Sequence, residues 1–142
     1  MSGRLGLIEQ TAQPLLVVDA SFVLCALAES GERSEAALEA LGCHKLVAPH
    51  LLPVEVASVL RKLTLRKELS EEAAAVAYTA MLGLEIDYAE YSPFAERVWE
   101  LRPNVQTYDA WYVALAESIS APLATGDDRL RKATGPKCAF FP

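Results

Sequence analysis

The sequence predicts an α/β domain of three layers, in which helices cover both faces of a mostly parallel central sheet. Short apolar runs that indicate strands alternate with longer segments whose apolar residues recur at helical spacing. The first run, at residues 15–18, has four consecutive apolar residues directly after Pro14, which is typical of a strand buried on both faces of a parallel sheet. A chain of 142 residues is long enough to bury a core of this kind, so we expect a single domain over residues 1–142.

Helix-starting and helix-ending residues divide the first half of the chain. Gly42 and Pro49 fall where elements are expected to end, and Pro53 suits a first helical turn, where its missing N–H costs nothing. Ser70 is a favoured helix cap and is followed by two acidic residues. We therefore expect an N-terminal arm at 1–13, strands at 15–18 and 45–48, and helices at 21–28, 34–41, 53–66 and 71–82.

The second half of the chain continues the alternation. The segment at 107–117 has apolar side chains on more than one face, which predicts a mostly buried helix capped by Thr107, with Trp111 and Tyr112 in the core and Glu117 in solvent. Residues 84–88 alternate as a strand does. We expect strands at 84–88, 122–125 and 138–141, and helices at 93–101, at 107–117 and directly after Asp127.

Composition excludes several classes of protein. Hydrophobic residues make up 52% of the chain, which excludes a disordered polypeptide, and the formal net charge of -6 excludes a basic protein that coats nucleic acid. A nucleic-acid substrate would therefore need a local basic patch or metal ions. The three cysteines are far apart and form no C-x-x-C pair, which favours a reduced, cytoplasmic setting. We expect neither a secretory leader nor a membrane-spanning segment.

Four acidic residues lie either directly after an expected strand or in the first turn of an expected helix. Asp19 and Asp127 each follow a strand, whereas Glu55 and Asp109 each lie in the first turn of a helix. In a parallel α/β sheet the strand ends and the starts of the following helices share one edge, so we expect the four carboxylates to face one crevice. For each acid taken alone, helix capping or the helix dipole is an alternative explanation.

Such a cluster is electrostatically costly. At about 5 Å and an effective dielectric constant of about 20, each ionised pair repels by roughly 3 kcal/mol, so either protons or a cation must neutralise the charge. Oxygen ligands with no His or Cys nearby favour Mg²⁺ or Mn²⁺ over zinc. A magnesium site of this kind is suited to phosphodiester hydrolysis.

Four stretches carry a resemblance to a known family, in the right order and over nearly the whole chain. They are Val17-Val18-Asp19-Ala20-Ser21, Leu52-Pro53-Val54-Glu55-Val56, Tyr108-Asp109-Ala110-Trp111-Tyr112-Val113-Ala114-Leu115-Ala116-Glu117 and Leu123-Ala124-Thr125-Gly126-Asp127-Asp128-Arg129-Leu130. Together they resemble the PIN domain family, and within it the VapC-type toxin ribonucleases. The last stretch holds two adjacent acids, Asp127 and Asp128, so which of them faces the site stays open, and we prefer Asp127 for its distance to Thr125.

The resemblance implies a Mg²⁺-dependent endoribonuclease, the toxin of a type II toxin–antitoxin pair. It implies that Asp19, Glu55, Asp109 and Asp127 hold the metal and position the attacking water. It also implies a homodimer and a cognate antitoxin that inserts a segment into the site. Two further groups are open to two interpretations. Ser21 and Thr125 either hydrogen-bond to the site or only form caps and turns. Arg129, Arg131 and Lys132 either contact RNA phosphates or form an ordinary solvated helix face.

Two other functions fit parts of the pattern. A non-catalytic PIN-like binding module would have the same fold, but all four acidic positions are filled, which favours an active enzyme. A receiver-like phospho-acceptor domain also places carboxylates at strand ends with Mg²⁺. That class needs an acidic pair after the first strand, whereas Asp19 stands alone and the acidic pair comes late in the chain.

Overall fold

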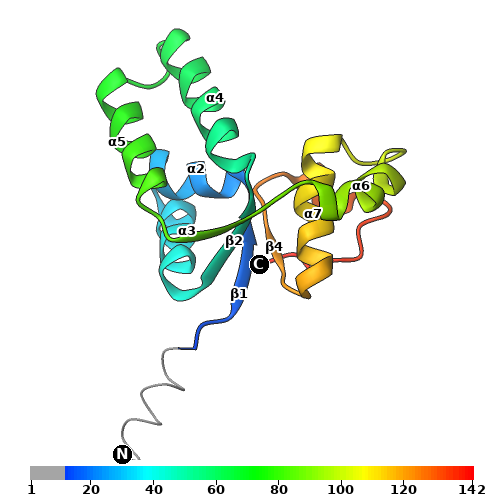
Figure 1. The fold of residues 1–142 in the computed structure, drawn as a ribbon. Helices are drawn as coiled ribbons and strands as arrows, with labels where there is room; N and C mark the ends of the chain where they lie inside the picture. Colours follow the sequence, from blue (N-terminus) through cyan, green and yellow to red (C-terminus); the bar gives the residue numbers. More distant parts are fainter. Residues whose placement is uncertain (1–11) are drawn as a thin grey trace, which may run out of the picture.

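The computed structural model describes residues 12–142, so most of the predicted arm at 1–13 lies outside the described residues. The centre of the fold is a four-stranded, fully parallel sheet in the order β3-β2-β1-β4 (Figure 1). Its strands are β1 (Leu15–Val18), β2 (Lys45–Pro49), β3 (Ile86–Ala89) and β4 (Leu123–Ala124). The predicted α/β class with a mostly parallel sheet is confirmed.

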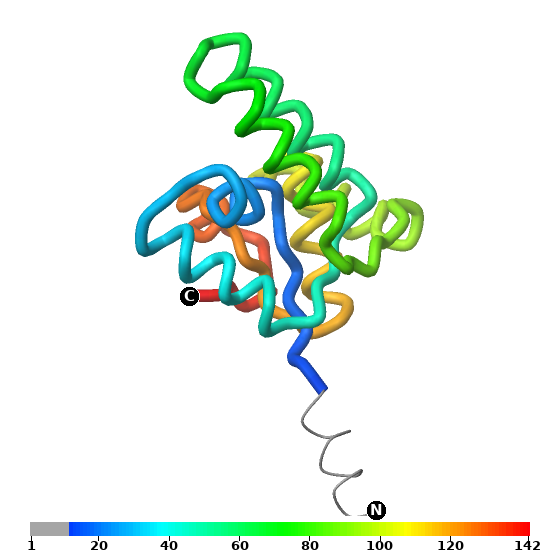
Figure 2. Tube along the Cα trace, turned by 90° about the vertical axis from the view of Figure 1, so that its left-hand side faces the viewer, coloured from blue at the N-terminus to red at the C-terminus, as the bar shows by residue number. Residues whose placement is uncertain are grey.

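Helices form a layer on each side of this sheet (Figure 1). One layer holds α2 (Ala20–Ala28), α3 (Glu32–Cys43), α4 (Leu52–Leu65) and α5 (Glu71–Leu82). The other holds the 3₁₀ turn η1 (Ser92–Phe94), α6 (Ala95–Leu101) and α7 (Thr107–Ile119), and the short helix α8 (Asp128–Lys132) follows β4. The α4–α5 hairpin projects well beyond the sheet, as the perpendicular view also shows (Figure 2). Within residues 12–142, none of the helices combines the length and the apolar character needed to cross a bilayer.

Strand β1 is the most buried part of the sheet, with no accessible surface on Leu16, Val17 or Val18. It has a strand on each side and a helix layer on each face, which explains why its sequence is an unbroken apolar run. The largest fully buried side chain that packs near it is Tyr112 of α7.

The strand order reverses at β1. The chain moves outward from β1 through β2 to β3 and then returns to the opposite side of β1 to form β4. In open α/β sheets, the crevice beyond such a reversal is where ligands bind. The receiver-like alternative requires another order, in which the third strand in the chain pairs with the first, so the observed sheet is incompatible with it.

Three details of the prediction are wrong. The expected strand at 138–141 is a single parallel bridge between Phe140 and Leu123, so this segment runs beside β4 without forming a ladder. Helix α7 is capped by Gln106 without a side-chain hydrogen bond, and Thr107 is already helical. Glu117 is not solvated, because its side chain is only 16% exposed and pairs with Arg97.

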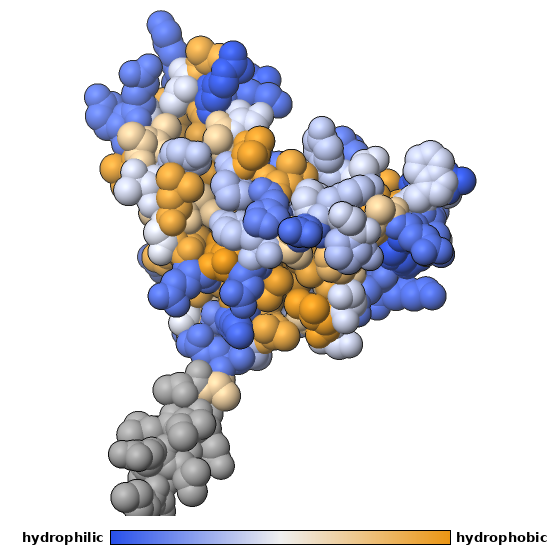
Figure 3. Space-filling model, in the orientation of Figure 1, coloured by the Kyte–Doolittle hydropathy of each residue, from blue (hydrophilic) through white to orange (hydrophobic). Residues whose placement is uncertain are grey.

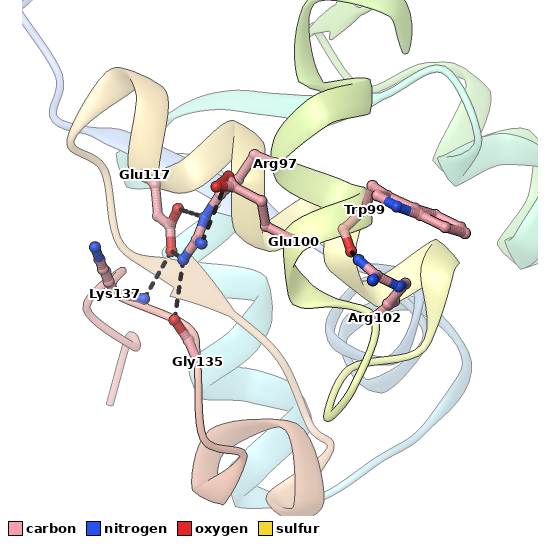
Figure 4. Close-up of polar contacts among 7 residues, drawn as sticks. All are labelled: Arg97, Trp99, Glu100, Arg102, Glu117, Gly135 and Lys137. Atoms are coloured by element: carbon pink, nitrogen blue, oxygen red, sulfur yellow. Dashed lines mark hydrogen bonds and ion pairs between the residues drawn. The ribbon is translucent and has the colours of Figure 1, made fainter.

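Glu117 ties the C-terminal segment to α6 and α7 (Figure 4). The Arg97 guanidinium donates to both of its carboxylate oxygens, at 2.8 and 3.1 Å, and to the carbonyl of Gly135 at 3.0 Å. The backbone N–H of Lys137 donates to Oε2 of Glu117 at 2.7 Å. Burial alone would raise the pKa of the Glu117 carboxyl, but Arg97 and the Lys137 amide outweigh it and hold that pKa below its usual value.

We expect Glu117→Gln to lower the free energy of unfolding by about 1–3 kcal/mol, because it removes a charge-assisted, partly buried pair. A carboxyl whose pKa is depressed by folding contributes stability above its unfolded pKa and loses it as the pH falls. The difference between wild type and variant should therefore shrink below about pH 4. Urea unfolding between pH 3 and pH 7 measures both effects.

The matched control is Glu100→Gln. Glu100 approaches the same arginine only at 3.9 Å, and its side chain is 58% exposed, so the change should cost less than about 0.5 kcal/mol. Equal losses of unfolding free energy in the two variants would show that the Glu117–Arg97 pair does not stabilise the fold.

Candidate active site

Asp19 lies where β1 ends and α2 begins. Its Oδ1 accepts hydrogen bonds from the Phe22 backbone N–H at 2.9 Å and from the Ser21 hydroxyl at 2.7 Å. The residue is 6% exposed. Asp19 is therefore the N-cap of α2 and also a buried carboxylate at the reversal point of the sheet, so capping and a site role do not exclude each other.

Ser21 and Thr125 join the ends of β1 and β4. The Ser21 hydroxyl donates to Asp19 and accepts from the backbone N–H of Gly126 at 2.8 Å, and it lies 3.4 Å from the Thr125 hydroxyl. Thr125 in turn accepts from the backbone N–H of Asp127 at 3.1 Å. These contacts hold the two strand ends, and the acids that follow them, in a fixed relation.

Asp127 caps α8 and faces the other acids. Its Oδ1 accepts from the backbone N–H groups of Arg129 at 2.9 Å and Leu130 at 3.4 Å. Its negative charge raises the pKa values of Asp19 and Asp109. The neighbouring Asp128 is exposed. Of the two adjacent acids, Asp127 is the one whose charge acts on Asp19 and Asp109, which agrees with our preference for it.

Glu55 is held by a residue that the sequence analysis assigned only to the core. It lies in the first turn of α4, and its Oε1 accepts a 2.6 Å hydrogen bond from the hydroxyl of Tyr112 on α7. Tyr112 is 1% exposed, and burial together with Glu55 raises the pKa of its phenol, so it remains a donor. One signal pointed to it, because Tyr112 follows Asp109 by three residues and therefore shares its face of the helix.

The four carboxylates repel one another. Burial, and then the charges of Asp19 and Asp127, raise the pKa of Asp109 to about 6, although Arg129 partly offsets them. Burial also raises the pKa of Glu55, with Asp109 and Asp19 adding to the shift against the Tyr112 hydrogen bond. The pKa of Asp19 is raised in the same way, chiefly by burial. The acids expected at one sheet edge do interact across one site.

A hollow in the surface marks this edge. In the space-filling view the outline dips between the projecting α4–α5 hairpin and the end of the α6–α7 layer (Figure 3). The α4–α5 hairpin forms one wall of this hollow and α7 forms the other. Glu55 lies in the first turn of α4, and Asp109 lies in the first turn of α7. Asp19 and Asp127 follow the strands between them.

The donor set suits a hard divalent cation. It consists of carboxylate and hydroxyl oxygens, and burial together with the neighbouring negative charges raises the pKa values of Asp19, Glu55 and Asp109. Among residues 12–142, no three Asp, Glu, His or Cys side chains already converge closely enough to form a metal cage.

The basic side chains of α8 differ in their surroundings. Arg129 is exposed, and its charge acts on Asp109. Arg131 instead donates to the carbonyl of Phe141 and lies 5.9 Å from the centre of the Phe140 ring, so it secures the C-terminal segment. Lys132 is exposed at the end of the helix.

Comparison with known proteins decides the family, because the PIN domain model matches residues 16–136. The chain belongs to the PIN domain family. Ribonuclease VapC1 of Mycobacterium tuberculosis is 44% identical over 86% of this PIN domain chain and 92% of its own length. Ribonuclease VapC9 of the same species is 36% identical over 87% and 94%, respectively.

Solved structures share the fold of this PIN domain. PAE2754 from Pyrobaculum aerophilum has a TM-score of 0.66 and 22% identity, and covers 89% of this chain and 83% of its own. The structure of VapBC2 from Rickettsia felis, bound to a DNA fragment from its promoter, also has a TM-score of 0.66. It is 12% identical and covers 89% of this chain and 97% of its own. The resemblance to the PIN domain family that the four sequence stretches carry is confirmed.

Burial and the neighbouring negative charges, which together raise the pKa of Asp109, predict how the stability of the metal-free PIN domain depends on pH. Asp109 binds its proton more tightly in the folded protein than in the unfolded chain, so stability should fall as the pH rises from about 4 to about 6. Asp109→Asn removes this titration, and the variant should lose less stability over that range. Urea unfolding in EDTA at several pH values measures the slopes.

Asp128→Asn is the control, because it removes an exposed charge from the same region and should keep the wild-type slope. The Glu117 effect lies at lower pH and is common to all three proteins. If the stability of Asp109→Asn fell with pH as steeply as that of wild type, the raised pKa of Asp109, and with it the interaction among the acids, would be contradicted.

Proposed function

We propose that this PIN domain protein is an endoribonuclease that hydrolyses RNA phosphodiester bonds with Mg²⁺, or Mn²⁺ in its place, bound by Asp19, Glu55, Asp109 and Asp127. The observation that carries the proposal is the placement of the four acids at the reversal point of the sheet, with Asp19 buried after β1 and Glu55 held by the Tyr112 hydroxyl. The similarity to curated relatives named Ribonuclease VapC supports the same enzyme class. Bound Mg²⁺ would activate a water molecule and stabilise charge on the phosphate.

The residues of the chain have distinct tasks in this proposal. Asp19 and Asp127 are held by hydrogen bonds to backbone N–H groups, so they form the rigid base of the site. Glu55 and Asp109 approach from the two helix walls. Because the net charge of -6 repels RNA, a local cation is needed, and Arg129 is the α8 side chain best placed to contact a phosphate.

We also propose that the chain is the toxin of a type II toxin–antitoxin pair and binds a cognate antitoxin. The VapC relatives and the structural likeness to VapBC2 support this assignment. The homodimer and the cytoplasmic location remain predictions. Large apolar side chains are exposed on the α4–α5 hairpin, and apolar patches are visible there in Figure 3. An assembly that covers Val54, Val76 and Leu82 would remove this apolar surface from water.

Cleavage of a mixed RNA pool tests the proposed activity. We expect cleavage with Mg²⁺ and none with EDTA. Asp19→Asn should lower the rate by at least about a hundredfold, since even residues that only support metal ligands cost about 10–100-fold when removed.

Asp128→Asn is the matched control and should cleave at close to the wild-type rate, because its side chain is exposed. Full activity in Asp19→Asn with metal present would show that the active site lies elsewhere. Absence of cleavage by wild type over a pool that includes tRNA and ribosomal RNA would favour a non-catalytic binding module.

A further inference from the structure

We propose that Tyr112 is a positioning residue of this site, whose hydroxyl orients the Glu55 carboxylate toward the other acids. The inference rests on the proposed function, because it assigns Glu55 a part in metal binding. The geometry behind it is the 2.6 Å hydrogen bond from the Tyr112 hydroxyl to Oε1 of Glu55, which joins residues 57 positions apart in the sequence.

Tyr112 is a rigid donor. Its ring lies in the middle of α7, is 1% exposed and is among the largest fully buried side chains of the described residues. Close packing restricts the movement of a ring buried to this degree, and a buried phenol needs a hydrogen-bond partner. The direction in which the hydroxyl points is therefore set by the core.

Glu55 needs such a partner more than the aspartates do. Asp19 and Asp127 are short side chains, each fixed by two hydrogen bonds from residues next to them in the chain. Glu55 has one more rotatable bond, and the charges of Asp109 and Asp19 push it away from the site. The Tyr112 hydroxyl holds Oε1 against that repulsion, which fixes how the second oxygen, Oε2, is presented.

The bond also links the two walls of the crevice, since Glu55 belongs to the α4–α5 hairpin and Tyr112 to α7 (Figure 1). A purely structural bond between the walls would lower stability when broken and would leave metal affinity unchanged. A positioning role predicts a loss of metal affinity and of turnover in a protein that remains folded. The two roles can therefore be separated by experiment.

Tyr112→Phe is the direct test, because it removes only the hydroxyl. We expect Mn²⁺ affinity, measured by electron paramagnetic resonance of free Mn²⁺, to fall about tenfold or more, and kcat for RNA cleavage to fall about 10–100-fold, with KM changed less than threefold. Tyr88→Phe is the matched control. Tyr88 is a half-buried tyrosine that stacks on His50 at 5.6 Å, and its variant should match wild type in both measurements.

Combination with Glu55→Gln shows whether Tyr112 acts through Glu55. If it does, Tyr112→Phe should add less than about threefold to the loss caused by Glu55→Gln alone. Glu55→Asp, which leaves Tyr112 intact but shortens the carboxylate, gives an independent measurement and should also lose Mn²⁺ affinity.

The inference would be overturned if either Tyr112→Phe or Glu55→Asp kept the Mn²⁺ affinity and turnover of wild type. It would also be overturned if the losses of Tyr112→Phe and Glu55→Gln multiplied in the double variant. An unfolded Tyr112→Phe would leave Glu55→Asp to decide. Wild-type protein that neither binds Mn²⁺ nor cleaves RNA would overturn the proposed function, and with it this inference.

Discussion

Parallel pairing of β1 with β2 on one side and β4 on the other is the constraint on which the rest of the molecule depends. It directs the carboxyl ends of all the strands to one edge and places Asp19 and Asp127 beside each other after two adjacent strands. Helix α4 follows β2 and starts at this edge, and α7, which runs back before β4, starts there as well, so Glu55 and Asp109 come to the same crevice. The same pairing that builds the sheet thus brings together the four acids of the proposed site, which span positions 19 to 127 of the chain.

Stability and function oppose each other at this edge. The apolar residues of β1 favour folding, whereas the acid at its end is buried among like charges and has a raised pKa. Hydrogen bonds from Ser21 and the Phe22 backbone N–H compensate part of that cost at Asp19, and the Tyr112 hydroxyl does the same at Glu55. At the other end of α7, Glu117 and Arg97 show the opposite arrangement, since the paired charges there stabilise the fold. Like charges thus gather at the edge where we propose that a cation binds.

Features with local causes were predictable from the sequence, and features with distant partners were not. The strand before Asp19 was predictable because four apolar residues follow a proline, and the acids at strand ends and helix starts were found by their positions. The segment at 138–141 has the composition of a strand, but only Phe140 pairs, so the ladder is absent. Glu117 was misplaced because its partners, Arg97 and Lys137, are each 20 residues away in the chain. Tyr112 resembled any core aromatic until the fold brought Glu55 to its hydroxyl.

Crystals soaked in Mn²⁺ and measured at the manganese absorption edge would test the central claim, that these four acids form one metal site. We expect an anomalous peak in the crevice, with an Asp19 oxygen and at least one oxygen of Glu55, Asp109 or Asp127 at about 2.0–2.3 Å, a distance typical of hard divalent cations on carboxylates. Peaks confined to other parts of the surface, with the crevice empty at millimolar Mn²⁺, would contradict the account.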